Sequence, residues 1–88
     1  METKEGYNLE LKEEVSRTFL KTVCAYANYN DGEIIFGIDD RGIVVGVMNA
    51  KEETLRIENM INDSLVPIPD YNIKVEETGN AEIIPLQV

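Results

Sequence analysis

The sequence predicts an α+β fold, a mixed β-sheet covered by two helices in the order β-α-β-β-α-β-β. Two long segments carry apolar residues at every third or fourth position, which is typical of amphipathic helices. Shorter segments between them are alternating or wholly apolar and end at Gly, Pro or Asn, as strands do. The most apolar run, 34–38, is expected to lie in the central strand, because a strand that is covered on both faces tolerates such a run.

The first half of the chain supplies one strand and one helix. Strict alternation over 7–12 predicts a half-buried strand. The segment 16–30 is expected to form the first helix, with Ser16 as its N-cap and Gly32 just beyond its end. One apolar stripe should face the core, made of Phe19, Leu20, Val23, Cys24 and Ala27.

The middle of the chain predicts a hairpin. The strand 33–38 should turn at 39–42 and return as a second strand at 43–47. Gly37 inside the first of these strands suggests that another backbone or a helix approaches closely.

A second helix is expected from 50 to 65, with Asn49 as its cap and Leu55 on its buried face. Two prolines after it, Pro67 and Pro69, should force an extended connection. A second hairpin is expected to follow, with strands at 71–77 and 81–88. Pro85 marks the last of these as an edge strand or a bulged one.

Length and charge limit the possible functions. The 88 residues are 43% hydrophobic and are expected to form one domain, residues 1–88. Because the chain stops at Val88 inside an expected strand, we interpret it as an N-terminal part of a longer protein. The net charge of −9 opposes binding to a polyanion. Binding of nucleic acid would therefore depend on a local basic patch, on a metal ion, or on parts of the longer protein.

Several functional classes find no support. The chain has no histidine, which removes the commonest general base, and no P-loop motif for a nucleotide. Its one cysteine, Cys24, cannot form an internal disulfide, which favours a cytoplasmic location, and it is expected to be a buried hydrophobic residue. No apolar run reaches the roughly 18 residues of a membrane span, so no membrane contact is expected.

Acidic side chains are the first candidates for chemistry. They are Glu5, Glu10, Asp39 and Asp40. If the first strand and the central strand are neighbours, three of these carboxylates could converge on Mg²⁺ or Mn²⁺ and orient water against a phosphodiester. The alternative is structural: Glu10 pairs with Lys12 or Arg41, and the two aspartates form the turn.

Basic side chains are the second candidates. They are Lys12, Arg17, Lys21 and Arg41. They lie on or near the polar face of the first strand, the first helix and the first hairpin. Together they could contact nucleic-acid phosphates, in which case Lys12→Ala should weaken binding on every sequence alike. The alternative is a solvated surface with ordinary ion pairs.

Several motifs, in the right order, resemble the Schlafen AlbA_2 domain family. They are Glu5, Leu9-Glu-Leu-Lys12, Ala25-Tyr-Ala-Asn28, Gly32, Ile34-Ile-Phe-Gly-Ile-Asp-Asp40 and Gly42-Ile-Val-Val-Gly-Val47. The similarity covers nearly the whole chain. Two positions depart from the pattern: Leu11 replaces an aromatic residue, and Asp31 replaces the first glycine of a pair.

The resemblance implies an Alba-like fold and a role as a DNA-binding module of a bacterial transcriptional regulator, without a cofactor. It also implies an alternative, because eukaryotic relatives use three acidic residues in a metal-dependent ribonuclease. Glu5, Glu10 and Asp39 match those positions, so such an enzyme would hold Mg²⁺ or Mn²⁺ there. A third alternative is a protein-interaction module that forms a homodimer through the expected edge strand 81–88.

Overall fold

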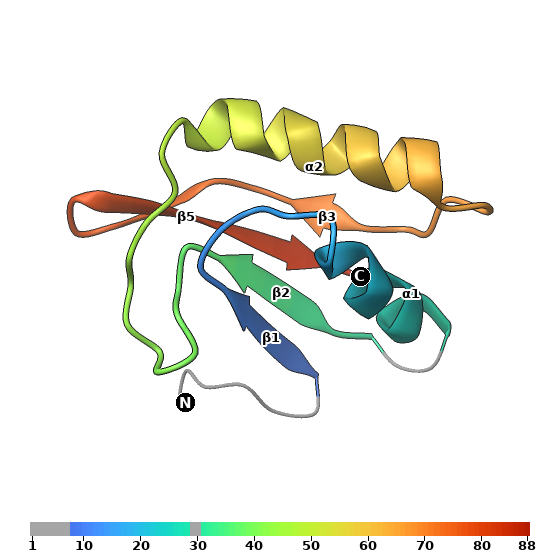
Figure 1. The fold of residues 1–88 in the computed structure, drawn as a ribbon, viewed down its shortest axis with the longest axis horizontal. Helices are drawn as coiled ribbons and strands as arrows, with labels where there is room; N and C mark the ends of the chain where they lie inside the picture. The colour runs from blue at the N-terminus through green and yellow to red at the C-terminus, as the bar shows by residue number, and fades with distance from the viewer. Residues whose placement is uncertain (1–7, 29–30) are drawn as a thin grey trace.

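A computed structural model describes residues 8–28 and 31–88, and it confirms the predicted α+β class (Figure 1). Two helices pack on one face of a five-stranded mixed sheet, through a core shared with the internal strands. The elements are β1 (Leu9–Lys12), α1 (Phe19–Asn28), β2 (Glu33–Phe36), α2 (Ala50–Ser64), β3 (Asn72–Ile73), β4 (Glu76–Thr78) and β5 (Ala81–Gln87).

The sheet has the order β1-β2-β5-β3, and β4 also pairs with β5. β1 and β2 are parallel, with Leu11 opposite Ile35, and the other pairs are antiparallel. β2 is internal, as the apolar run predicts. The parallel pair places the carboxyl ends of β1 and β2 at the same end of the sheet.

The prediction of an edge position for the last strand is wrong. β5 is internal, with β2 on one side and β3 and β4 on the other. The carbonyl of Pro85 accepts a bond from the Lys74 N–H at 3.2 Å, so the missing N–H of the proline faces the same side. On that side β5 faces the gap between β3 and β4. The missing N–H of Pro85 therefore removes no hydrogen bond of a strand ladder. A homodimer built on a free edge at 81–88 therefore has no basis in this fold.

The expected strand 43–47 is also absent. Only one isolated bridge, from Ile38 to Val44, joins it to the preceding strand. The N–H groups of Val45 and Gly46 both donate to the Gly37 carbonyl, at 2.8 and 2.9 Å. A positive φ of 81° at Gly46 turns the chain there, so the segment continues as a loop instead of a strand.

The first helix begins later than predicted, at Phe19 instead of Ser16. The first bonds of this segment join residues three apart, such as Phe19 N–H to the Ser16 carbonyl at 3.3 Å, so the chain enters as a tight 3₁₀-type turn. The buried face also differs from the predicted stripe: Tyr26 is buried, whereas Ala27 is exposed and Cys24 only half-buried.

The main core lies between the helices and the sheet. Its largest fully buried side chains are Phe19, Phe36, Ile34, Ile57, Ile61, Ile84, Leu86 and Val23. The rings of Phe19 and Phe36 meet edge to face, with centroids 5.4 Å apart. Helix α2 follows its predicted range, except that Leu55 points to solvent with 58% of its surface exposed. Asn49 precedes the helix, without a side-chain cap bond.

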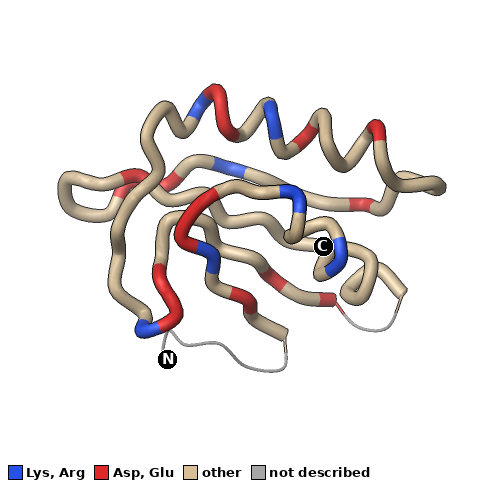
Figure 2. Tube along the Cα trace, in the orientation of Figure 1, with Lys and Arg blue, Asp and Glu red and all other residues tan. Residues whose placement is uncertain are grey.

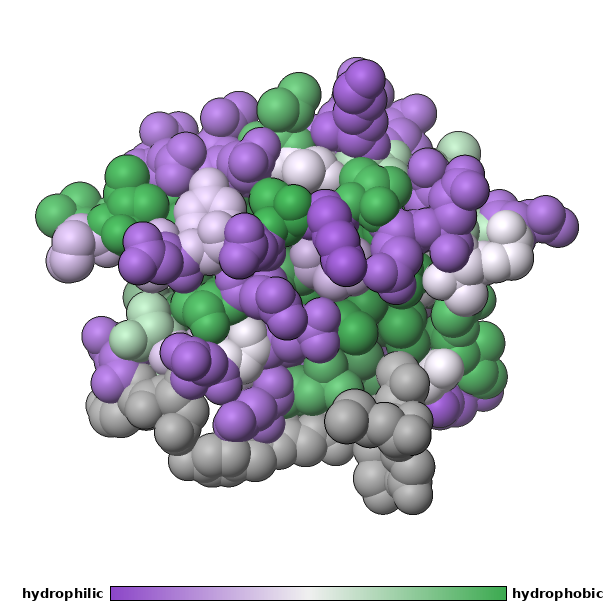
Figure 3. All heavy atoms as spheres, turned by 180° about the vertical axis from the view of Figure 1, so that it is seen from behind, coloured by the Kyte–Doolittle hydropathy of each residue, from purple (hydrophilic) through white to green (hydrophobic). Residues whose placement is uncertain are grey.

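A smaller cluster lies on the opposite face of the sheet, where Leu11, Ile38 and Ile83 are buried. A Cβ on Gly37 would lie 3.3 Å from the backbone carbonyl oxygen of Glu82, so the predicted close approach of another backbone is confirmed, and it would also lie 3.1 and 3.2 Å from the side chains of Val47 and Ile83. Seen from behind, hydrophobic side chains are visible in the middle of the molecule among hydrophilic ones (Figure 3). In residues 8–28 and 31–88, neither helix has the length and apolar content that crossing a membrane requires.

Candidate nucleic-acid interface

Arg17 and Lys21 are exposed and belong to the start of the first helix. Arg17 lies in the turn before α1, and its guanidinium donates to the Ser64 hydroxyl at 3.3 Å. Lys21 follows four residues later in α1. Ser64 is the last residue of α2, so this bond links the start of one helix to the end of the other. Both cations are exposed to solvent, and the bond to Ser64 orients Arg17.

Lys12 lies at the carboxyl end of β1, where it forms an ion pair with an acidic residue of the same strand. Its ammonium lies 3.7 Å from the Glu10 carboxylate, and the two side chains are only 25% and 34% exposed. The Lys12 carbonyl accepts the Gly37 N–H at 2.7 Å, which ties this residue to the end of β2. If Lys12 contacted a phosphate, the Glu10 carboxylate would still offset part of its positive charge.

Arg41 belongs to the turn that follows β2. Its guanidinium lies 3.1 Å from the Asp39 carboxylate, and 74% of its side chain is exposed. Because guanidinium has five N–H donors, the remaining donors still face solvent. Arg41 is therefore oriented by an ion pair without being buried by it.

Asp39 organises this turn from a buried position, with 5% of its surface exposed. One carboxylate oxygen accepts the backbone N–H groups of Ile43 and Arg41, both at 2.9 Å. The other accepts the Arg41 guanidinium. The bond from Ile43 and those from Arg41 hold the pKa of Asp39 below its usual 3.8, although burial acts in the opposite direction.

Of the three carboxylates of the ribonuclease alternative, the two that the structure describes, Glu10 and Asp39, have protein partners. Glu10 pairs with Lys12, and both oxygens of Asp39 accept protein donors. Glu5 lies outside the described residues. No group of three metal-ligating side chains occurs within residues 8–28 and 31–88. A divalent ion at Asp39 would have to compete with Arg41, and the Mg²⁺ or Mn²⁺ site stays a prediction.

Positive and negative segments are interspersed along the tube in Figure 2. Of the four predicted cations, Lys12 and Arg41 leave the same end of the sheet, whereas Arg17 and Lys21 belong to the helix side. No sequence pattern indicates the bond from Arg17 to Ser64, because 47 residues separate the two. The arrangement offers isolated phosphate contacts instead of a continuous basic surface.

The sequence pattern of the Schlafen AlbA_2 family matches residues 1–88, the whole chain. The chain belongs to the Schlafen AlbA_2 family. A search of curated proteins found no match to this AlbA_2 domain.

Its fold is similar to the solution NMR structure of the N-terminal domain of an ATP-dependent DNA helicase RecG-related protein from Nitrosomonas europaea. The TM-score is 0.76 at 19% identity, over 91% of this chain. The chain spans only 61% of that solved domain. At this identity the similarity concerns the fold.

Proposed function

We propose that this AlbA_2 domain is a DNA-binding module of a larger protein, such as a transcriptional regulator, and that Arg17 and Lys21 make its main phosphate contacts. The observation that carries the proposal is the exposure of these two cations, neither of which forms an ion pair with a carboxylate of residues 8–28 or 31–88. The family and the RecG-related neighbour, which is named for a DNA helicase, support DNA as the ligand.

Arg41 and Lys12 are secondary contacts in this proposal. Arg41 is exposed and oriented, but Asp39 and the exposed Asp40 offset its charge. Lys12 is half-buried and paired. Each of these two would gain less from a phosphate than an unpaired cation, because the neighbouring carboxylate repels that phosphate.

Two phosphate contacts make binding weak and dependent on salt. On duplex DNA, each neutralised phosphate contributes about −0.9 to the slope of log affinity against log salt, which gives about −1.8 for the pair. Raising salt from about 50 to about 200 mM should then weaken binding roughly twelvefold. With a net charge of −9, the isolated domain should bind only at low salt.

The test is fluorescence anisotropy with a labelled DNA duplex of about 20 base pairs at about 50 mM salt. The variant Arg17→Gln/Lys21→Gln should bind at least about tenfold more weakly than the unmodified chain. The matched control, Lys51→Gln/Lys74→Gln, removes the same charge from two other exposed positions and should lose much less.

Equal weakening in both double variants would contradict the proposed contacts, because only the net charge would then matter. No binding by the unmodified chain at high micromolar concentration would remove the proposal for this domain alone. Repeating the titration with a single-stranded RNA of equal length decides between DNA and RNA as the preferred ligand.

A further inference from the structure

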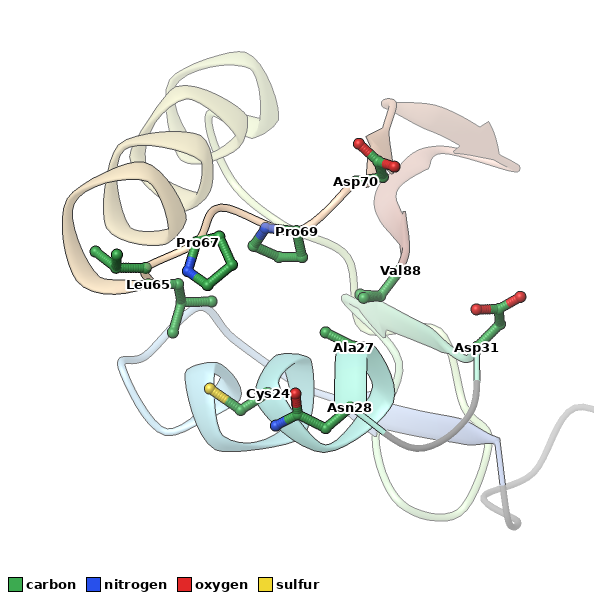
Figure 4. A pocket seen from close by; sticks show the side chains of 10 residues that line it. Cys24, Ala27, Asn28, Asp31, Leu65, Pro67, Pro69, Asp70 and Val88 are labelled. Carbon is green, nitrogen blue, oxygen red and sulfur yellow. The ribbon is translucent and has the colours of Figure 1, made fainter.

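A cavity of about 390 Å³ lies between the C-terminal half of α1, the loop 65–70 and the end of β5 (Figure 4). Its size is within the range of small ligand pockets. Most of its walls are apolar, and they are formed by Cys24, Ala27, Leu65, Pro67, Pro69 and Val88. The loop also carries an exposed apolar side chain to this site, because Val66 lines the cavity with 95% of its surface exposed.

Two exposed carboxylates, Asp31 and Asp70, line the same cavity. In Figure 4, Asp70 is seen above Val88 and Asp31 to its right. A second hollow of about 650 Å³ shares Asp31, Asp70 and Val88 with the first and adds Glu33. No lysine or arginine is among the described residues that line either hollow. The two hollows therefore form one groove with an apolar part and a negatively charged part.

We propose that this groove binds an extended basic segment of a partner protein and takes up one of its lysine or arginine side chains. The alkyl part of such a side chain would cover the apolar wall, while its charged end would reach Asp31 and Asp70. Charge complementarity selects this occupant, since three carboxylates repel a nucleic acid and offer nothing to a purely apolar peptide.

None of the proposed DNA contacts lines the groove. Arg17 and Lys21 lie in the turn before α1 and in its first half, whereas the groove is lined by the same helix from Cys24 onward. The groove adjoins the beginnings of β1 and β2, at Asn8 and Glu33. Lys12 and the turn with Arg41 leave the opposite ends of these two strands. Failure of DNA binding would therefore not contradict peptide binding in the groove. Failure of peptide binding would likewise not contradict DNA binding.

The probe is a blocked hexapeptide, acetylated and amidated, with two arginines separated by valine. Titration into the 88-residue chain is followed through the backbone amide signals in ¹H–¹⁵N NMR spectra. We expect the largest shifts at Ala27, Asp31, Asp70 and Val88. The same peptide with citrulline, which is neutral and of equal shape, should bind about three- to tenfold more weakly.

The variant Asp31→Asn/Asp70→Asn should lose the preference for arginine over citrulline. Both positions are exposed, so the fold should persist. Asp63→Asn, an exposed acid on α2, is the matched control and should retain the preference. Equal binding of the two peptides, or an unchanged preference in the double variant, would overturn the proposal. Spermidine that binds in the groove as tightly as the arginine peptide would also overturn it, because a free polyamine would then suffice.

Discussion

The contact between Phe19 and Phe36 should fix the start of α1 on the sheet. Phe19 is the first residue of the helix and lies between the two proposed DNA contacts, Arg17 and Lys21. Both rings are fully buried and meet at 5.4 Å and 85°, which is an edge-to-face aromatic pair. Replacing either ring by leucine keeps an apolar side chain but removes this pairing.

The magnitude follows from the geometry. Each single exchange, Phe19→Leu or Phe36→Leu, should cost about 1–2 kcal/mol of unfolding free energy, less than the roughly 3–5 kcal/mol of a truncation to alanine. The pair itself should contribute about 0.5–1.5 kcal/mol of that. A domain of 88 residues has a total stability of about 4–13 kcal/mol, so the variants should remain folded.

The assay is a double-mutant cycle by urea unfolding, followed by circular dichroism. The double variant should lose less stability than the two single variants together, by about 0.5–1.5 kcal/mol, because the pairing can be lost only once. Additive losses would refute the direct contact between the two rings.

The remaining predictions concern two turns and their backbone. Gly37→Ala should destabilise the domain by at least about 1 kcal/mol more than Gly79→Ala in urea unfolding, since both have positive φ but only Gly37 has close neighbours. Equal costs would contradict the packing at Gly37. Asp39→Asn should destabilise at neutral pH. The pKa of Asp39 is lower in the folded protein than the 3.8 of the free side chain, so its carboxylate stabilises the fold above pH 3.8. This contribution disappears as pH falls through the folded pKa, and the unfolding free energies of wild type and variant should converge there. A difference that is independent of pH would contradict the role of the charge.

Local sequence patterns predict the helices and the central strand well. Helix α2 was expected at 50–65 and is found at Ala50–Ser64, because its apolar period and the following prolines both act within the segment itself. β2 follows from its apolar run for the same reason. The start of α1 was displaced because Ser16 opens a 3₁₀-type turn and bonds to the neighbouring Thr18 hydroxyl at 2.9 Å.

The errors arise where distant segments decide the structure. The apolar residues at 43–47 suggested a strand, but Val47 instead donates to the Glu82 carbonyl at 2.8 Å, and Ile43 stays half exposed. Pro85 suggested an edge strand, because a proline has no N–H for a neighbouring strand. It lies in an internal strand because β3 and β4 break opposite it, and no local sequence pattern shows that break. The groove was not predicted at all, since Asp31 and Asp70 come together only in the folded chain.

The most direct test of the central claim is the salt dependence of DNA binding by three forms of the chain. The unmodified chain and Lys51→Gln/Lys74→Gln should both give a slope of log affinity against log salt of about −1.8 or steeper, and Arg17→Gln/Lys21→Gln a slope shallower by about 1.8, which leaves only the secondary contacts of Arg41 and Lys12. If all three forms share one slope, Arg17 and Lys21 do not contact phosphates.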